Sequence, residues 1–527
     1  MTGSRVVLGA AWVLAGGVAL AQTAAPLPHT PPAPLLAAPA PAAAGAVPGV
    51  FDLTEFVHRA IVGNAATQAA HLQALAAGRL VASERALYDP AVFGRLRREG
   101  VDRPRSDDEI SSGLFTSAGG KTETLENNNN AAAGLRGRLP SGATFELSQD
   151  LRRRASNLLS DPAEREHRGT LTLTLKQPLL RGYGRSSTEA DLRVAEKEQQ
   201  IEQQRLVKQV LELVGEAAGT WWRLHQAERL LAVRRQGLQT AFELQAETRR
   251  RVEGGFAPRI DLLEAELAIA SRQTELTRAQ QALVEAQARA RNLLGQEAPQ
   301  EPGPVRAAPV APVPWLDAAT GSAAGWTPAL LERWPAYQIA QRRLEQEQLR
   351  LDHARRQERP DVSLELGLNR NSLSDRAGSA WERSLGAAHQ GWFAGVLLEM
   401  PLANDAARSR REAQMLRRDA ARAQADGEAR LMASEWVTRQ GQVQASRSEL
   451  EQLQRELAAR EALLAAEKEN HALGRSRLRQ LIEAQDRVED GRLRLADAEL
   501  RARLSDLAFM TIAGSLLEDF GVRLALR

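Results

Sequence analysis

The chain has 527 residues, a formal net charge of +3 and no cysteine, and only 4% of its residues are aromatic. Without cysteine it has no disulfide framework, no thiolate metal site, no cysteine nucleophile and no cysteine-linked lipid anchor. The near-zero charge gives no electrostatic reason to expect nucleic acid as a partner. The aromatic content argues against a large β-barrel made by one chain, and the mean hydropathy of -0.37 indicates a water-soluble protein.

The first 21 residues predict a signal peptide. Arg5 supplies the positive charge, residues 6–20 form a short apolar run, and Ala19-Leu20-Ala21 is a small-residue cleavage site. This run is too short to span a bilayer as a helix, and no later stretch reaches about 18 uninterrupted apolar residues. We therefore expect an exported protein without a transmembrane helix.

The next segment, residues 22–50, is rich in alanine and proline and predicts a disordered spacer. A helical pattern then opens at Phe51 and runs to about Tyr88, where Pro90 ends it. A second stretch rich in proline and alanine, Pro299 to Pro314, predicts a linker in the middle of the chain, which we place at residues 297–326.

The two sides of this linker resemble each other, which predicts a duplicated unit. Residues 64–92 align without gaps on residues 334–362, and the later segments 177–179 and 400–402 match in the same order. Each unit reads as helix, strands, very long helix, tight turn and helix. The predicted division is: signal peptide 1–21, spacer 22–50, first repeat 51–296, linker 297–326, second repeat 327–513, and C-terminal tail 514–527.

Strands are expected in two regions, about residues 90–178 and about 361–400. Alternation or apolar runs mark the candidates 144–151, 169–175, 362–369 and 392–398. Such strands could line a soluble core or face lipid, and the pattern leaves both possibilities open. Trp381, Trp392 and Phe393 would suit the aromatic girdle of a membrane barrel.

The first strand region is much longer than the second. Residues 102–130 are polar and include four consecutive asparagines, Asn127 to Asn130, so they predict a loop. Residues 135–139 and 144–151 could form an additional hairpin around the turn at 140–142. The number of strands in this region is therefore left open.

Two segments predict unusually long helices, residues 185–252 and 403–473, because both lack proline and contain rows of leucine at seven-residue spacing. About 70 residues would make a helix of about 100 Å. Each repeat has too few strands to close a barrel, and an open sheet edge cannot lie in hydrocarbon. If the strands lie in a membrane, several chains must combine to close the sheet.

Three motifs carry a resemblance to a known family. Residues 170–184 (TLTLTLKQPLLRGYG) are similar to its strand-to-helix junction, and residues 358–364 (ERPDVSL) to its helix-to-strand entry. A glycine followed by a leucine or isoleucine pair and an alanine occurs twice, in 255–265 and 474–484. With the duplication, these motifs make the chain resemble the TolC family of outer-membrane efflux proteins over about residues 51–515.

The resemblance implies an α+β membrane protein, with a long antiparallel α-helical coiled-coil barrel in the periplasm and a β-barrel in the outer membrane. In this family three identical chains each give four strands to a shared 12-stranded barrel. A periplasmic adaptor and an inner-membrane RND or ABC pump dock beneath it. The implied function is a passive exit duct that contacts outer-membrane lipid and needs no cofactor or metal. The alternative is a periplasmic coiled-coil adaptor or structural protein without a pore.

The tight turns between the long helices are the candidate docking sites for the adaptor. The residues concerned are Gly254, Gly255, Phe256 and Pro258 in the first repeat and Leu473 and Gly474 in the second. The family places acidic residues six and nine positions after the turn glycine around a closed aperture. Transferred to this chain, the positions are Asp261, Glu264 and Glu483, and the fourth is Gln480, which departs from the pattern. Carboxylates in a first helical turn also complement the helix dipole, so both interpretations stand.

The family also places an arginine two residues after the second turn glycine, where it ties neighbouring helices together. This chain has Ser476 there, flanked by Arg475 and Arg477, and either arginine could substitute. A catalytic role is not expected, because the eight histidines are dispersed and form no metal-binding pair of the H-E-x-x-H type. The sequence does not identify the transported cargo.

Overall fold

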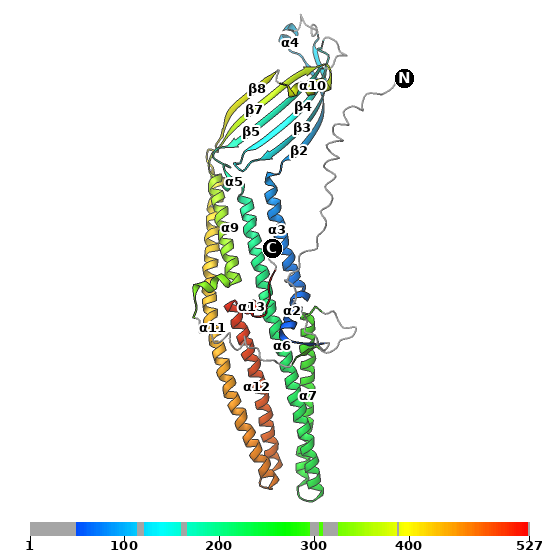
Figure 1. Cartoon of the computed structure of the whole chain (residues 1–527), viewed down its shortest axis with the longest axis vertical. Helices are drawn as coiled ribbons and strands as arrows, with labels where there is room; N and C mark the ends of the chain where they lie inside the picture. The colour runs from blue at the N-terminus through cyan, green and yellow to red at the C-terminus, as the bar shows by residue number, and fades with distance from the viewer. Residues whose placement is uncertain are drawn as a thin grey trace, which may run out of the picture. The chain divides into compact units, whose positions relative to one another are not determined.

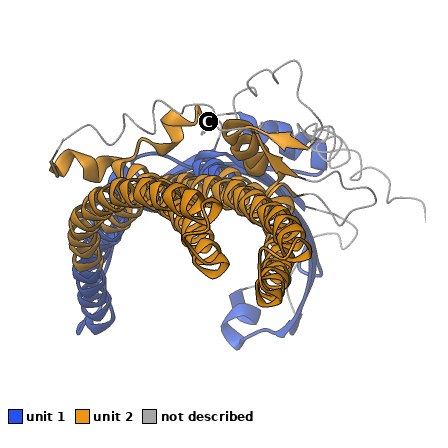
Figure 2. Cartoon of the chain, turned by 90° about the horizontal axis from the view of Figure 1, so that it is seen from below, with its two compact units in different colours: residues 1–31, 78–198, 345–420 blue, residues 32–77, 199–344, 421–527 orange. Residues whose placement is uncertain are grey.

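The computed structural model describes residues 49–112, 121–159, 166–295, 305–308, 325–386 and 389–524. The predicted signal peptide, nearly all of the predicted spacer and most of the predicted linker lie outside these ranges. The chain divides into two compact units, which are coloured separately in Figure 2. Unit 1 contains residues 78–198 and 345–420, and unit 2 contains residues 49–77, 199–344 and 421–524, within the described ranges.

Unit 1 is built on one antiparallel sheet of six strands in the order β2-β3-β4-β5-β7-β8, which lie side by side in Figure 1. The strands are β2 (Ala91–Pro104), β3 (Glu123–Arg138), β4 (Thr144–Ser156), β5 (Glu166–Pro178), β7 (Asp361–Ser374) and β8 (Gln390–Glu399). Short helices accompany them: α4 (Asp107–Ser112), α5 (Arg185–Thr188) and α10 (Ala377–Leu385). The predicted strands at 144–151, 169–175, 362–369 and 392–398 are confirmed, since they lie within β4, β5, β7 and β8.

The prediction of a loop over residues 102–130 is wrong. Its two ends belong to β2 and β3, and the four asparagines lie inside β3, where Asn127 is opposite Gly100 and Asn130 opposite Arg97. Strands β2 and β4 flank β3, so the ladder hydrogen bonds form through the backbone whatever the side chains are. The additional hairpin suggested by residues 135–151 is confirmed as β3–β4, with Gly142 at φ +90° in its turn.

Unit 2 is helical, and Figure 2 shows its helices lying in a curved row. Its elements, several of which begin or end in unit 1, are α2 (Leu53–Gly63), α3 (Ala65–Arg85), α6 (Ala190–Glu253), α7 (Arg259–Leu293), α9 (Pro335–Gln357), α11 (Asp405–Ala472), α12 (Leu478–Ala513) and α13 (Leu516–Asp519). The short elements are β1 (Val50–Phe51), β6 (Arg306–Ala307) and the 3-10 turns η1 (Ala86–Tyr88) and η2 (Pro328–Arg333). Strands β1 and β6 pair in parallel.

Two predicted helices are interrupted where a side chain or a backbone conformation ends them. The helix predicted from Phe51 breaks at Asn64, whose Oδ1 accepts a hydrogen bond of 3.1 Å from the Thr67 backbone N–H and caps α3. The helix predicted from Arg185 breaks at Glu189, between α5 and α6. The long helices α6 and α11 otherwise run as the absence of proline predicts.

The largest core of unit 2 forms where α2, α6 and the C-terminal segment meet. Its fully buried side chains include Phe56, Leu206, Leu224, Met510 and Phe520. Trp221 lies in this core, and its indole N–H donates to the Phe51 carbonyl at 2.9 Å. A smaller cluster of Leu244, Ala265, Leu478 and Leu481 packs close to the turns that join α6 to α7 and α11 to α12.

Candidate functional site

The sheet of unit 1 has one apolar face. Residues directly opposite each other in an antiparallel sheet point to the same side, so the register traces each face across all six strands. One such row runs across the whole sheet and is apolar throughout: Val92, Leu135, Leu147, Leu173, Leu368 and Trp392. We call the side that carries this row the apolar face.

The apolar face is exposed in the single chain. Val92 is 82% exposed and Trp392 is 78% exposed, whereas apolar side chains in the core of a soluble protein are buried. Other exposed apolar residues on this face are Leu96, Leu366, Val396 and Leu398. The opposite face is polar: Thr170, Thr172 and Thr174 lie on it, and Lys176 forms an ion pair of 2.8 Å with Glu365. This division favours lipid on one side of the sheet and water on the other.

Helix α10 packs on the apolar face near the end of the sheet where β5 begins and β7 ends. Gly169 leaves the space for it, because a side chain at this position would meet the Ala380 carbonyl. Gln149 donates to the Ser384 hydroxyl, and Ser372 to the Ala380 carbonyl. Trp381 lies on this helix, and Trp392 lies in the apolar row.

Phe393 does not share this location, which corrects its grouping with the two tryptophans. It follows Trp392 in β8 and therefore points to the opposite face, where its ring covers Gly367. The predicted aromatic set is thus divided between the two faces of the sheet by the alternation of the strand.

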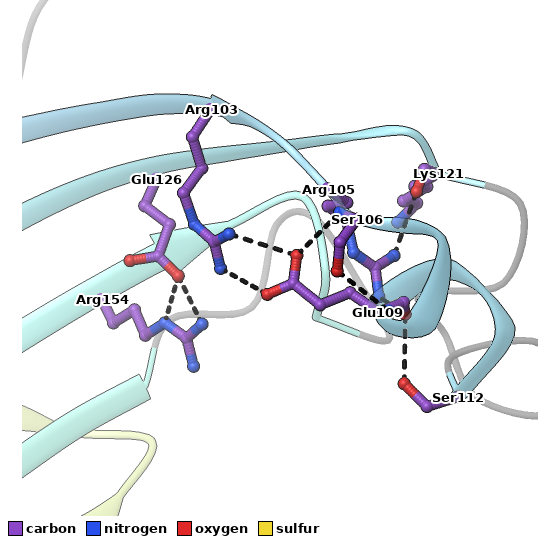
Figure 3. A network of polar contacts seen from close by, with 8 residues as sticks. All are labelled: Arg103, Arg105, Ser106, Glu109, Ser112, Lys121, Glu126 and Arg154. Carbon is purple, nitrogen blue, oxygen red and sulfur yellow. Dashed lines mark hydrogen bonds and ion pairs between the residues drawn. The ribbon is translucent and has the colours of Figure 1, made fainter.

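A network of arginines and carboxylates lies at the same end of the sheet, around the end of β2 and the start of β3 (Figure 3). Arg103 forms two hydrogen bonds with Glu109, at 2.8 and 3.1 Å, and so ties α4 to the end of β2. Arg154 on β4 pairs with Glu126 on β3. The charge of this end is partly compensated within the chain.

The two turns between the long helices have the same backbone geometry. We call residues 254–258 the first tip and residues 473–477 the second tip. Gly255 has φ +74° and Gly474 has φ +73°. In each tip the backbone N–H of the third residue after the helix donates to a helix carbonyl five residues back, Phe256 to Arg251 and Arg475 to Asn470, both at 2.8 Å. The preceding glycine donates to a carbonyl three residues back, at 3.0 Å in both tips. This is the Schellman arrangement, which favours glycine at the left-handed position.

The predicted aperture carboxylates lie in the first two turns of the return helices, Asp261 in the first turn of α7 and Glu264 and Glu483 in the second turns of α7 and α12. Asp261 and Glu264 are half-buried on α7, and Glu264 lines a groove of about 670 Å³ together with Glu483 of α12. Glu483 pairs with Arg479 at 3.2 Å. The side chain of Gln480 accepts from the Arg477 backbone N–H at 3.2 Å, so this departure from the family pattern caps its own helix.

The arginines predicted to hold the tips together do not do so within one chain. Among the described residues, the side chains of Arg475 and Arg477 form no ion pair. Instead, Arg251 donates to Nε2 of His471 at 3.1 Å and so joins the end of α6 to the end of α11. His471 Nδ1 lies 3.2 Å from the Ser476 carbonyl, which makes Nδ1 the protonated nitrogen. Sequence reasoning missed this contact, because the two residues are 220 positions apart.

A second contact that the sequence did not reveal is a buried charge cluster about two to five turns along the helices from the tips. Arg272 of α7, only 5% exposed, binds Asp486 of α12 at 2.8 Å and lies 3.8 Å from Glu489. Arg234 of α6 binds Glu489 at 2.7 Å and also pairs with Glu275. The cluster therefore joins three helices of unit 2.

Two titratable side chains on α6 are shifted by their surroundings. Burial lowers the pKa of His225, and the positive charge of Arg229 lowers it further; the ring stacks on Trp221 with centroids 5.7 Å apart. Burial raises the pKa of Glu228, an effect that Arg306, 3.7 Å away, partly offsets. Neither residue adjoins the tips.

Within the described ranges, no group of three or more histidine, aspartate or glutamate side chains is arranged to hold a metal ion. Among the helices that the structure describes, none is both long and apolar enough to cross a bilayer.

Comparison with known proteins agrees with this geometry. Residues 142–296 match the family model of the outer membrane efflux proteins. The fold is shared with CusC (TM-score 0.61, 14% identity, 88% of this chain and 93% of that chain). It is also shared with VceC of Vibrio cholerae (0.59, 15%, 88% and 96%) and CmeC of Campylobacter jejuni (0.61, 12%, 88% and 85%). No curated protein sequence matches the chain.

The chain is mostly helical with one antiparallel sheet, and it has the fold of these outer-membrane channels. The predicted resemblance to the outer-membrane efflux family is confirmed by the match over residues 142–296 and by the shared fold.

Proposed function

We propose that three copies of this chain form a passive exit duct in the outer membrane. Their sheets share one β-barrel in the bilayer, and their long helices form a tunnel in the periplasm. The duct receives its cargo from a periplasmic adaptor and an inner-membrane RND or ABC pump, in a tripartite efflux or type I secretion system. The observation that carries this proposal is the exposed apolar face of a sheet whose two edge strands have no outer partner among the described residues.

The sheet explains why several copies are needed. In hydrocarbon an unpaired backbone N–H or C=O costs several kcal/mol, so an open sheet does not occur there. The edge strands β2 and β8 have no partner on their outer sides among the described residues. A ring of identical chains removes both edges at once.

The alternative, a periplasmic adaptor or rod without a pore, needs the same long helices but not the apolar face. Side chains such as Val92, Trp392 and Val396 would then face water in a contiguous patch, which soluble proteins avoid. The patch therefore favours the duct.

The two tips support a duplicated architecture and an adaptor-docking role. They repeat the same hydrogen bonds and the same glycine conformation in both halves of the chain. Phe256 is 88% exposed and Leu473 is 58% exposed, which offers an adaptor apolar contacts at each tip. Gly254, Gly255, Pro258 and Gly474 set the direction of the turns.

For the periplasmic aperture we propose two elements. Asp261, Glu264 and Glu483, repeated three times around the axis, form a negative ring that favours cations. The contact between Arg251 and His471 holds the two tips of each chain together in the closed state. Arg475 and Arg477 are then available for neighbouring chains or the adaptor.

The lipid contact is assigned to Trp392, which lies on the apolar face, and to Trp381 of α10, the helix that packs on this face, with Phe393 facing the barrel interior. A pair of lysine substitutions tests this assignment and the proposed function together. Leu173→Lys places a charge on the apolar face, at a cost of about 2–4 kcal/mol if the site lies near the middle of the bilayer. Thr172→Lys, one residue away on the polar face, is the matched control.

We expect wild type and Thr172→Lys to give heat-modifiable trimers in outer-membrane fractions that conduct ions in planar bilayers, and Leu173→Lys to give little trimer. Equal trimer yields of the two variants would contradict the assigned faces. A wild-type protein found only as a soluble periplasmic monomer would contradict the duct itself.

A further inference from the structure

The sheet of this chain is larger than the family resemblance implies. That resemblance gives each chain four strands, whereas the described residues contain six strands in one continuous sheet. The two additional strands lie in the first half of the chain. Four strands of the sheet, β2 to β5, precede the first long helix α6, and only two, β7 and β8, precede the second long helix α11. The edges of the sheet are β2 and β8.

The even number of strands makes these edges compatible with each other. All neighbours in the sheet are antiparallel, so β2 and β8, the first and the sixth strand, also run in opposite directions. When β8 of one copy lies beside β2 of the next, the pairing is again antiparallel. Bacterial membrane barrels are antiparallel throughout.

The register within the chain gives the stagger of the strands. Directly opposite residues lead from Ala91 at the start of β2 to Phe393 in β8, which is six residues before the end of β8 at Glu399. If the two strands end level at the junction, Ala91 lies opposite Glu399 of the next copy. The stagger is then six residues for every six strands.

This stagger corresponds to an ordinary barrel. Six residues extend about 20 Å along a strand, and six strand spacings extend about 29 Å across the sheet. The ratio gives a strand tilt of about 35°, at the lower end of the tilt of about 35–45° in known barrels. The closing register therefore needs no unusual geometry.

The side chains also match at this junction. Val92 lies opposite Leu398 and Leu96 opposite Ala394, so the apolar face continues from one copy to the next. Further along, Arg98 lies opposite Trp392 on the same face. No like charges are placed directly opposite each other along the paired segment.

Building on the proposed three-copy duct, we infer that β8 of each chain pairs with β2 of the next copy, so that three six-stranded sheets close a barrel of 18 strands rather than 12. The number of strands sets the width of a barrel. Barrels of about 16–18 strands leave an aqueous channel, so this exit would be a wide one.

The absence of cysteine allows a direct test by disulfide cross-linking, because only the introduced cysteines can form a disulfide. The pair Val92→Cys and Leu398→Cys places two thiols on opposite strands and on the same face, within the distance that a disulfide spans. The pairs Val92→Cys with Val396→Cys, and Gly94→Cys with Leu398→Cys, test registers shifted by two residues. The matched control, Val92→Cys with Leu397→Cys, places the thiols on opposite faces.

We expect oxidation of the Val92/Leu398 variant in outer-membrane fractions to give covalent dimers and trimers on denaturing gels without reductant, with at least tenfold less product from the control pair. The reduced sample should run as a heat-modifiable trimer, which shows that the variant has assembled. Cross-linking in a shifted pair would give the same strand number with another tilt, and would also support the proposal.

A 12-stranded barrel would instead leave β2 and β3 outside the ring and pair β8 with β4. The pair Phe145→Cys and Leu398→Cys would then cross-link and the β2–β8 pairs would not, which would overturn the 18-stranded barrel while leaving the duct intact. A trimer without cross-linking in any β2–β8 pair would overturn it as well. A protein that never forms trimers would contradict the proposed function too.

Discussion

Replacing Arg272 should loosen the helical part of the protein more than replacing any exposed arginine. The substitution Arg272→Met keeps much of the side-chain volume and removes the charge. It takes away the contact of 2.8 Å with Asp486, the contact of 3.8 Å with Glu489 and a hydrogen bond of 3.2 Å to the Gly237 carbonyl. Glu489, only 9% exposed, then keeps Arg234 as its one described cationic partner.

The expected loss follows from burial. Breaking a buried ion pair costs about 3–5 kcal/mol, because the remaining charge stays buried without its partner. Arg234 still binds Glu489, and the Asp486 side chain is 59% exposed, so we expect the lower end of this range. A loss of about 3 kcal/mol in the free energy of local opening corresponds to about 150-fold faster amide exchange.

Hydrogen exchange of the trimer in detergent, followed by mass spectrometry of α7 and α12 peptides, measures this loss. The matched control is Arg492→Met, which removes an ion pair of 2.8 Å with Glu461 whose side chains are 40% and 44% exposed. The control should cost at most about 1 kcal/mol, or about fivefold in exchange. The second substitution Glu489→Gln should restore much of the protection lost in Arg272→Met.

If Arg272→Met and Arg492→Met accelerate exchange equally, burial does not determine the strength of these pairs and the reasoning is refuted. If Glu489→Gln fails to restore protection, the loss does not arise from a buried Glu489 carboxylate that keeps only one of its two cationic partners.

Three further predictions concern single positions. The lowered pKa keeps His225 neutral in the folded protein, whereas in the unfolded chain it takes up a proton below about pH 6.5. The melting temperature of wild type should therefore fall relative to that of His225→Phe as the pH drops below about 6.5, and a constant difference between pH 7.5 and 5.5 would contradict this. Gly255→Ala should destabilise by about 1 kcal/mol because φ is +74°, whereas Gly427→Ala, inside α11 with open space around it, should stabilise slightly in the same thermal unfolding assay. His471→Leu should speed amide exchange at both tips up to about tenfold, and His471→Gln, which keeps an acceptor for Arg251, should speed it less; equal effects would show that the hydrogen bond contributes nothing.

Local patterns in the sequence predicted the parts of the fold that local patterns determine. Alternation at 169–175 and 362–369 identified β5 and β7, and the absence of proline identified α6 and α11. The polarity of the asparagines in β3 wrongly predicts a loop, because the backbone hydrogen bonds of this strand are formed with its two neighbours and do not depend on side-chain polarity. Closeness in the sequence places Phe393 beside Trp392, but adjacent residues of a strand point to opposite faces.

Of the candidate site, only the glycine turns could be predicted from the sequence. Gly255 and Gly474 were identified because glycine and a following helix pattern mark such turns, and the structure gives both a positive φ. Arg251 and His471 lie far apart in the chain, and their local sequences do not predict the contact. The same holds for Arg272, an arginine in a helix rich in charged residues, whose burial depends on α6 and α12 packing around it.

The extra hairpin of the sheet also bears on how pore width can change during evolution. In a ring built by three copies, one hairpin inserted into one gene adds six strands to the barrel, and its diameter grows by about 10 Å. A single added strand would leave every junction between copies with parallel neighbours, so the smallest workable step is a whole hairpin. The bore of such an exit therefore changes in discrete increments, set by gene insertion rather than by gradual substitution of the residues that line it.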